Sequence, residues 1–421
     1  LKEKQLYVLT SGSYFFRVPV KNEKETSKVE YSDWFKRGHC DHVEFILPTG
    51  IQKVLTHYAG ENLGSAQNVE LISKVVNKLR DRLGNRVDLK LIREFRFNAF
   101  YRNCNDELVA TLMVPISNYR PPTGIYYTHV ELSKVYEIFK CSMENVYDEE
   151  YSKQPTCLGH IGSKYAIDEE ALFTWIQTLN KEVKNLKVST RGIQGLIDYH
   201  NSYVLYVATI SMVLTGHRPV NDVFNDRNFF FLEDDLIAIA DKKTEVSELR
   251  FIPLCFLLKE QLIHYKNHLT NLAKRIKPFN KTLAANILFT SEIQKRHYKP
   301  YLFVIENEQL HGISFTNFKS YWGSDFNLPS NFNRYFLSSF LCKQNLSREL
   351  INNLLGHLEH GQDQLNLTNS INIKKLNQPL KIKLEELAND LFLLEPVKGL
   401  FAAKKDEILN LPINFESKPQ D

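Results

Sequence analysis

Residues 204–219 read VLYVATISMVLTGHRP, an apolar run that ends at a glycine and is followed closely by an arginine. The run from Val204 to Leu214 is the most hydrophobic of the chain, and it closes a helical pattern that begins at residue 192. Its length suits a helix buried in a protein core, because a membrane span needs about 18 or more apolar residues. Glycine is the residue type that most often ends a helix. The pattern therefore predicts a long core helix that ends at Gly216, with Arg218 just beyond it.

The segments on either side of this helix predict a mainly helical chain. Residues 168–186, DEEALFTWIQTLNKEVKNL, favour a helix with an acidic first turn. Residues 229–253 alternate apolar and polar side chains around polar turns, which predicts two or three antiparallel strands. Further helices are expected within residues 313–357, interrupted near Pro329, and over residues 382–394. One more amphipathic helix, ended by Pro278, is predicted by apolar residues at steps of four and three: Leu258, Leu262, Tyr265, Leu269, Leu272 and Ile276.

The length of 421 residues allows two or three domains, each with its own core. Residues 1–65 mix β-branched and aromatic runs with turn residues, which predicts a short β-containing N-terminal module. Residues 66–183 are expected to form a helical domain, and residues 184–421 a third domain with a helical C-terminal tail. The expected fold class is therefore mainly α with a small antiparallel β-sheet.

The positive charge of the chain is concentrated in one segment. The net charge of +4 is small for this length, so the total by itself indicates no nucleic-acid partner. Between Leu71 and Arg102, however, nine basic residues stand against only Asp81, Asp88 and Glu94. Two interpretations stay open: a solvated helix face, or a surface that follows the phosphates of a duplex. The basic residues are Lys74, Lys78, Arg80, Arg82, Arg86, Lys90, Arg93, Arg96 and Arg102.

The six cysteines are scattered, so we expect free thiols in a reducing compartment. Two stretches, residues 38–42 (GHCDH) and 157–160 (CLGH), contain metal-ligand types, but their spacing is not that of a zinc finger or ribbon. We therefore expect neither a metal nor another cofactor. No apolar run approaches about 18 residues, so no membrane association is expected, and the predicted location is cytoplasmic, associated with the nucleoid.

Four short boxes follow one another in the C-terminal half. The first is Thr215-Gly216-His217-Arg218, at the end of the predicted core helix. The second is the pair Lys242 and Lys243 in a predicted hairpin turn, followed by RFIPL at residues 250–254. The third is Asn331-X-X-Arg334, and the fourth is Leu354-Leu355-Gly356-His357. Over about residues 184–370, this order of elements and boxes resembles the catalytic domain of the tyrosine recombinase, or phage integrase, superfamily.

The resemblance implies a role for each box. Arg218 and Arg334 would grip the scissile phosphate, because a planar guanidinium donates to two phosphate oxygens at once. Lys242 or Lys243 would be the general acid towards the 5′ leaving oxygen. Asn331 stands where the family has a histidine, and it can still donate a hydrogen bond to a phosphate oxygen. His357 would supply a further donor, and residues 66–183 would correspond to a core-binding-like DNA-binding domain.

The chain departs from the family at the nucleophile. Asn366 occupies the place of the tyrosine, and no tyrosine follows Tyr335 in this sequence. The reaction needs a hydroxyl that attacks phosphorus, which an asparagine lacks. If this stretch is helical, Ser370 lies one turn further on the same face. Ser370 is therefore the candidate nucleophile. The simpler alternative is that Ser370 caps a helix or lies on the surface.

The function expected from these residues is binding of double-stranded DNA in the integration, recombination or transposition of a mobile element, without the usual tyrosine chemistry. One alternative is an active but atypical recombinase that uses Ser370 or a nucleophile supplied by a partner. A second alternative is a helical protein-interaction scaffold with a chance set of boxes. Two kinds of further partner on the DNA stay open: a second copy of the chain, or proteins encoded by the same mobile element.

Overall fold

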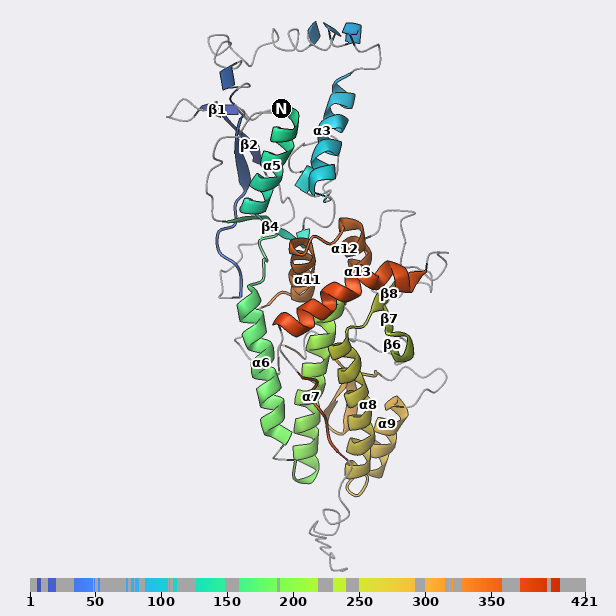
Figure 1. The fold of residues 1–421 in the computed structure, drawn as a ribbon. Coiled ribbons are helices and arrows are strands. Elements are labelled where there is room, and N and C mark those ends of the chain that lie inside the picture. Colours follow the sequence, from blue (N-terminus) through green and yellow to red (C-terminus); the bar gives the residue numbers. More distant parts are fainter. Residues whose placement is uncertain are drawn as a thin grey trace, which may run out of the picture. The chain divides into compact units, whose positions relative to one another are not determined.

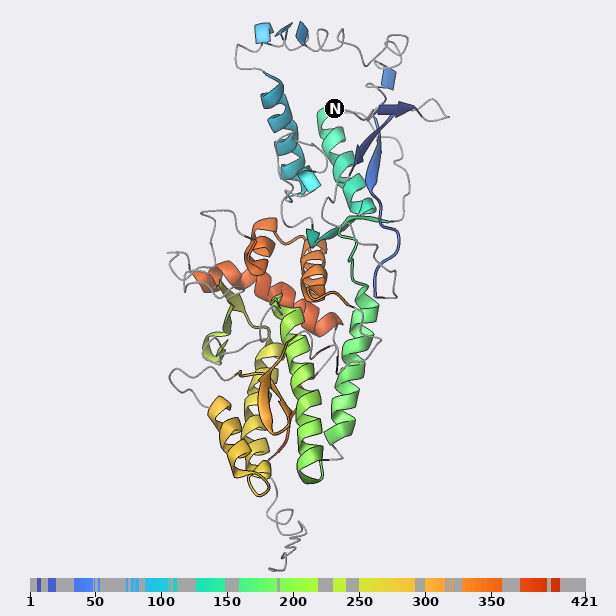
Figure 2. The ribbon, with the colours of Figure 1, turned by 180° about the vertical axis from the view of Figure 1, so that it is seen from behind.

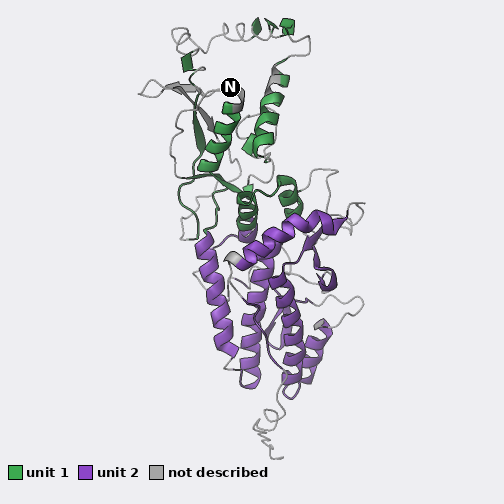
Figure 3. Cartoon of the chain, in the orientation of Figure 1, with its two compact units in different colours: residues 1–168, 335–358 green, residues 169–334, 359–421 purple. Residues whose placement is uncertain are grey.

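The structure is a computed structural model, and its elements are labelled in Figure 1. It describes residues 6–8, 14–19, 34–47, 49, 52–53, 73–74, 77–78, 80–82, 88–104, 106, 109–111, 126–147, 159–187, 190–218, 230–239, 250–291, 300–314, 318, 320, 328–357, 372–391 and 395–401. Within these residues the chain is mainly helical with small antiparallel sheets, as predicted. It forms two compact units, residues 1–168 with 335–358 and residues 169–334 with 359–421 (Figure 3). The predicted divisions after residues 65 and 183 stay predictions.

The first unit combines a three-stranded antiparallel sheet with helices. The sheet has the order β1 (Leu6–Val8), β2 (Tyr14–Pro19) and β3 (His42–Ile46), which confirms strands in the N-terminal part. Helices α3 (Leu89–Cys104) and α5 (Leu132–Tyr147) accompany it, and a short β4 (His129–Glu131) pairs with β5 (His160–Gly162). Aromatic rings from three elements form its core: the Phe139 ring lies 4.3 Å from that of Phe45 and 6.2 Å from that of Phe100.

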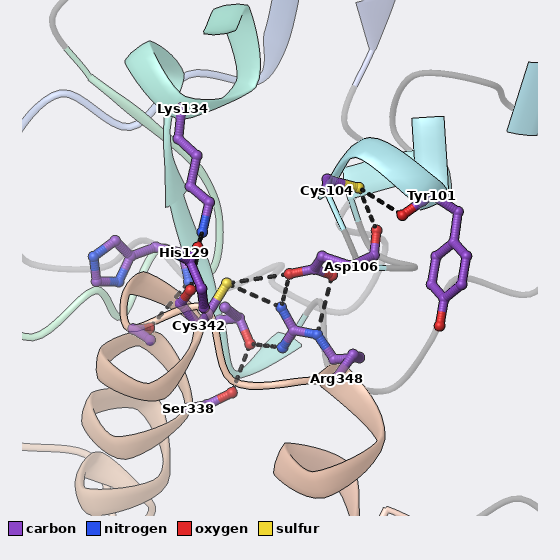
Figure 4. A network of polar contacts seen from close by, with 11 residues as sticks. Tyr101, Cys104, Asp106, His129, Lys134, Ser338, Cys342 and Arg348 are labelled. Carbon is purple, nitrogen blue, oxygen red and sulfur yellow. Dashed lines mark hydrogen bonds and ion pairs between the residues drawn. The ribbon is translucent and has the colours of Figure 1, made fainter. Parts of the chain in front are cut away.

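A segment from far along the sequence completes the first unit. It comprises most of α11 (Phe332–Lys343) and all of α12 (Arg348–Leu355). Arg348 is buried and donates to both carboxylate oxygens of Asp106, at 3.2 and 2.7 Å, and to Thr128 Oγ1 at 2.9 Å (Figure 4). The Thr128 hydroxyl also lies 2.6 Å from that of Ser338. This buried polar network ties residues 335–358 to the N-terminal part of the chain.

The second unit is built around α7 (Gly192–Thr215), the helix predicted from the apolar run. Every residue from Tyr203 to His217 is buried, and Gly216 ends the helix in the left-handed conformation with φ 64°. Helices α6 (Glu169–Leu186) and α8 (Phe256–Ile276) pack beside α7, and α9 (Lys281–Ser291) packs on α8 (Figure 2). The predictions for α6, α7 and α8 are confirmed to within a few residues.

Two small sheets accompany these helices. Strands β6 (Phe230–Phe231), β7 (Leu236–Ile239) and β8 (Arg250–Pro253) form the predicted antiparallel sheet. A hairpin of β9 (Phe303–Glu306) and β10 (Gln309–Gly312) lies against α7. There the Asn201 side chain donates to the Ile305 carbonyl at 3.0 Å and accepts from its N–H at 2.8 Å. One amide side chain thus pairs with the strand edge as a neighbouring strand would.

The last helix begins earlier than predicted. The sequence predicts it over residues 382–394, whereas α13 covers Ile373–Glu386 and continues as a π-helical turn, Leu387–Leu391. The side chain of Asn372 caps its first turn by accepting the Lys375 N–H, and Leu380 and Leu384 are buried. Burial of this apolar face outweighs Pro379, a residue that usually breaks a helix interior.

Residues 395–401 form a strap that contacts α7 and α8. The Tyr203 hydroxyl donates to the Val397 carbonyl at 2.7 Å, and the Leu400 N–H donates to His268 Nδ1 at 3.2 Å. Because Nδ1 of His268 accepts, its Nε2 carries the proton and donates to His200 Nδ1 at 3.1 Å. His200 in turn donates from Nε2 to the Phe303 carbonyl at 3.0 Å. Complete burial lowers the pKa of His200 to about 3, so this chain of hydrogen bonds is uncharged at neutral pH.

Candidate functional site

The candidate site centres on the turn that ends α7. The Thr215 hydroxyl donates to the Ser211 carbonyl at 2.6 Å and accepts the His217 N–H at 3.3 Å. The Gly216 N–H closes the helix on the Met212 carbonyl at 2.9 Å. These local bonds turn the backbone sharply, and the half-buried Arg218 follows directly. The predicted role of the glycine, to end the helix just before the arginine, is confirmed.

The first turn of α11 packs on this turn and binds its carbonyl groups. The Asn333 side chain donates to the carbonyls of Met212, at 2.9 Å, and His217, at 2.7 Å. Arg334 donates from Nη1 to the Gly216 carbonyl at 3.1 Å. These three bonds join residues that lie 116, 118 and 121 positions apart in the sequence. The structure brings the first and third boxes to one place in the second unit.

The two arginines differ in their exposure. Arg334 has no exposed surface, so its guanidinium shapes the turn from inside the fold. Arg218 and Asn331 are each half-buried, so they retain surface that a ligand can reach. A guanidinium stays charged at all ordinary pH values, and Arg334 therefore also adds a fixed positive charge beneath the turn. The arrangement can present cationic and amide donors to an anion, with Arg218 as the accessible cation.

Asn333 is the residue of this site that sequence reasoning missed. The family pattern marks Asn331 and Arg334, and it treats the two residues between them as variable. Asn333 is fully buried and its two hydrogen bonds join helices that are distant in sequence. A buried amide side chain destabilises a fold unless its polar atoms find hydrogen-bond partners of this kind. The only signal in the sequence is a polar residue beside Phe332 in a stretch that otherwise reads as a core helix.

His357 belongs to the first unit. It follows Gly356, which ends α12 with φ 64°, and its N–H donates to the Asn352 carbonyl at 2.8 Å. Its ring lies 4.7 Å from that of Tyr127, and the Tyr335 ring lies 5.2 Å from the same tyrosine. His357 therefore lies just past the end of α12, and its role as a further donor to a phosphate stays a prediction.

Several predicted residues lie outside the described part of the chain. These residues are the hairpin lysines Lys242 and Lys243, the candidate nucleophile Ser370, and Asn366, which stands at the place of the family's tyrosine. The strands that flank the turn are described, and β8 begins at Arg250, which is 4% exposed. The roles suggested for the lysines and for Ser370 therefore stay predictions.

The basic segment of the first unit is mostly exposed where the structure describes it. Arg80 is half-buried, Arg93 lies within α3, and Arg86 is outside the described residues. Lys90 lies 3.7 Å from Glu94 in a surface ion pair, which holds the lysine only weakly. Exposure agrees with both interpretations of this segment, a solvated face and a phosphate-binding surface. The exposed basic residues are Lys74, Lys78, Arg82, Lys90, Arg96 and Arg102.

The two metal-ligand-like stretches do meet in the first unit. His39 and His160 form a β-bridge, and the His160 ring lies 5.6 Å from that of His39 and 5.4 Å from that of His129. Burial lowers the pKa of His160 to about 4 and that of His129 to about 3, so both rings are neutral at pH 7. Among the residues that the structure describes, no group of three or more ligand-type side chains could hold a metal ion.

Five cysteines lie among the described residues, and none of them forms a disulfide there: Cys40, Cys104, Cys141, Cys255 and Cys342. Over the described ranges, no helix combines the length and apolarity that a membrane crossing requires. Comparison of the chain with protein-family models, with curated proteins and with solved structures finds no match.

Proposed function

We propose that this chain binds double-stranded DNA through a phosphate-binding site at the end of α7, as part of an integration, recombination or transposition process. The observation that carries the proposal is the junction of α7 and α11. There Asn333 and Arg334 hold the Thr-Gly-His-Arg turn through three hydrogen bonds to its carbonyls and to that of Met212. Arg218 belongs to the first box of the tyrosine recombinase resemblance. Residues of the third box hold the turn that carries it.

A phosphate diester suits this arrangement. It carries a single negative charge and two oxygens that a guanidinium can bind together. The half-buried position of Arg218 removes part of its water shell, which strengthens its interaction with an anion. The exposed basic residues of the first unit would add sequence-independent phosphate contacts, the kind that supply most of the affinity in non-specific DNA binding.

The proposal is for binding without tyrosine chemistry. Asn366 offers no hydroxyl, and the sequence holds no tyrosine beyond Tyr335. A nicked duplex that traps covalent intermediates tests this part directly. We expect no covalent protein–DNA adduct; an adduct that Ser370→Ala abolishes, with binding intact, would replace the proposal by the atypical recombinase.

Binding itself is tested by fluorescence anisotropy with a labelled duplex, titrated at several salt concentrations. Arg218→Ala should weaken binding roughly tenfold or more and reduce the slope of log affinity against log salt by about one. Arg218→Lys keeps the charge and loses the two-pronged geometry, so it should recover the slope but only part of the affinity. Lys266→Ala, an exposed lysine on α8, is the matched control and should leave both quantities unchanged. Absence of salt-dependent duplex binding in the parent chain would favour the protein-interaction scaffold.

A further inference from the structure

The second unit holds a cavity of about 810 Å³ between the last turn of α6, the first turns of α7 and the β9–β10 hairpin. This volume is typical of small-molecule sites, which range over about 300–1,000 Å³. The candidate phosphate site lies at the other end of α7, about 27 Å along the helix from Asp198 to Gly216. The proposed function therefore leaves this cavity unused.

The floor of the cavity is apolar. Ile197 of α7 and Ile305 of β9 line it and are 9% and 2% exposed. Leu186 and Ile193 line it as well and are half-buried. An aliphatic part of a ligand would leave water on entering this floor, which favours binding.

Three carboxylates line the cavity beside this floor: Asp198 from α7, and Glu306 and Glu308 from the hairpin. The exposed Asp198 accepts a hydrogen bond from Gln194 Nε2 at 2.7 Å. The exposed Glu308 accepts one from Asn280 Nδ2 at 2.8 Å. Both donors are neutral amides, so they position the two carboxylates without neutralising them. Every other residue that the structure places on the lining is uncharged.

Positive groups near the cavity do not cancel its charge. Lys187 is turned to the strap, where its Nζ donates to a backbone carbonyl at 2.8 Å. Among the residues that the structure describes, the exposed Arg191 forms no ion pair with Asp198, and the exposed Lys281 forms none with Glu308. The start of α7 adds about half a positive charge, which three carboxylates exceed. The cavity therefore favours a cationic ligand.

The spread of the carboxylates selects the class of cation. No group of three or more ligand-type side chains could hold a metal ion in the described part of the chain, so the three carboxylates do not converge on one point. A linear aliphatic polyamine matches separated carboxylates, because methylene groups separate its ammonium groups and can lie on the apolar floor. A basic peptide would instead place backbone N–H and C=O groups on this floor, where they would lose water without gaining partners.

We propose that this cavity binds a linear aliphatic polyamine. Asp198, Glu306 and Glu308 bond to its ammonium groups, and Ile197 and Ile305 contact its methylene groups. The inference goes beyond the proposed function and does not rest on it, because neither Arg218 nor a phosphate takes part. It predicts polyamine binding in the absence of DNA.

The test is isothermal titration calorimetry of the full-length chain with spermidine, without DNA and at about 0.15 M salt. Asp198→Asn and Glu308→Gln each remove one charge and keep an oxygen that accepts the bond from the neighbouring amide. Each should weaken binding roughly 2- to 10-fold, a modest factor because water and salt screen exposed charges. The double variant should show about the product of the two factors.

Glu170→Gln is the matched control, because Glu170 is an exposed carboxylate in the first turn of α6, at the other end of that helix from the cavity. It should leave spermidine binding unchanged, and circular dichroism should show all variants folded. Mg²⁺, which has charge but no methylene groups, should bind at least tenfold more weakly than spermidine.

Three results would overturn the inference. The first is no spermidine binding by the parent, or binding that neither Asp198→Asn nor Glu308→Gln weakens. The second is equal weakening by Glu170→Gln, or Mg²⁺ binding as tight as that of spermidine, since either would show a general attraction of cations. The third is a trilysine peptide that binds more tightly than spermidine and responds to the same variants, which would assign the cavity to a basic segment of a protein partner.

Discussion

The buried pair of Asp106 and Arg348 offers a sharp test of how the first unit is held together. We consider Arg348→Met, which keeps much of the side-chain length and removes the guanidinium. In the parent, Arg348 bonds to both oxygens of Asp106, to Thr128 Oγ1 and to Cys342 Sγ, the last at 3.2 Å (Figure 4). Burial by itself would lower the pKa of Arg348, but the Asp106 carboxylate and Cys342 raise it above its ordinary value. The arginine is therefore charged in the folded protein.

The cost of the substitution follows from what it leaves behind. Asp106 is 7% exposed, so Arg348→Met leaves a buried carboxylate without its cation. Breaking such a pair from one side costs about 3–5 kcal/mol, because the remaining charge keeps its desolvation penalty. For a unit of this size, about 2–4 °C of melting temperature is lost for each kcal/mol. We therefore expect the transition of the first unit to fall by roughly 6–20 °C.

The assay is differential scanning calorimetry, with the double variant Asp106→Leu, Arg348→Met beside the single one. Removing both charges should recover much of the lost stability, because no uncompensated ion stays buried. Lys140→Ala is the surface control: its ion pair with Glu144, at 3.7 Å, should contribute less than about 0.5 kcal/mol. A loss below about 1 kcal/mol in Arg348→Met, or a double variant as unstable as the single one, would refute the reasoning that an unpaired buried charge sets the cost.

Three further predictions concern other parts of the fold. In Gly399→Ala, the added methyl would collide with the His268 side chain, so the free energy of unfolding by urea should fall by about 1–3 kcal/mol, whereas the exposed Lys398→Ala should be neutral. Asn333→Ala removes the side-chain donor from the His217 carbonyl and from the Met212 carbonyl, which keeps the Gly216 N–H, so it should destabilise the second unit by about 1–3 kcal/mol and weaken duplex binding as Arg218→Ala does; unchanged binding with reduced stability would show a purely structural role. In the folded protein the pKa of His160 is about 4 and that of His129 is about 3, whereas the ordinary value is 6.5. Between these pH values the unfolded chain therefore binds more protons than the folded one. The stability that these two histidines contribute is complete above pH 6.5 and is lost as the pH falls towards 4. Urea unfolding at pH 7, 6 and 5 should show this loss, and the loss should be smaller in His160→Gln. A free energy of unfolding that rises on acidification would contradict the prediction.

The sequence by itself determined the elements whose signals are local. The core helix ending at Gly216, the acidic start of α6 and the alternation of β6 to β8 all depend on neighbours within a few residues, and all were predicted. Helix periodicity and glycine caps act over one or two turns of chain, so they can be recognised without the fold. The sequence left two interpretations of the basic segment open, and the exposure of most of its described residues agrees with both.

Only the tertiary structure decided which distant residues meet. Arg348 lies 242 positions from Asp106, and Asn333 bonds to carbonyls 116 and 121 positions away. The strap residue Val397 reaches Tyr203 across 194 positions. Nothing in the spacing of these residues marks them as partners, because each contact forms only once packing has buried both groups and removed water as the competing partner. The same cause left Asn333 unnoticed in the sequence: its amide acquires a role only where two helices cross.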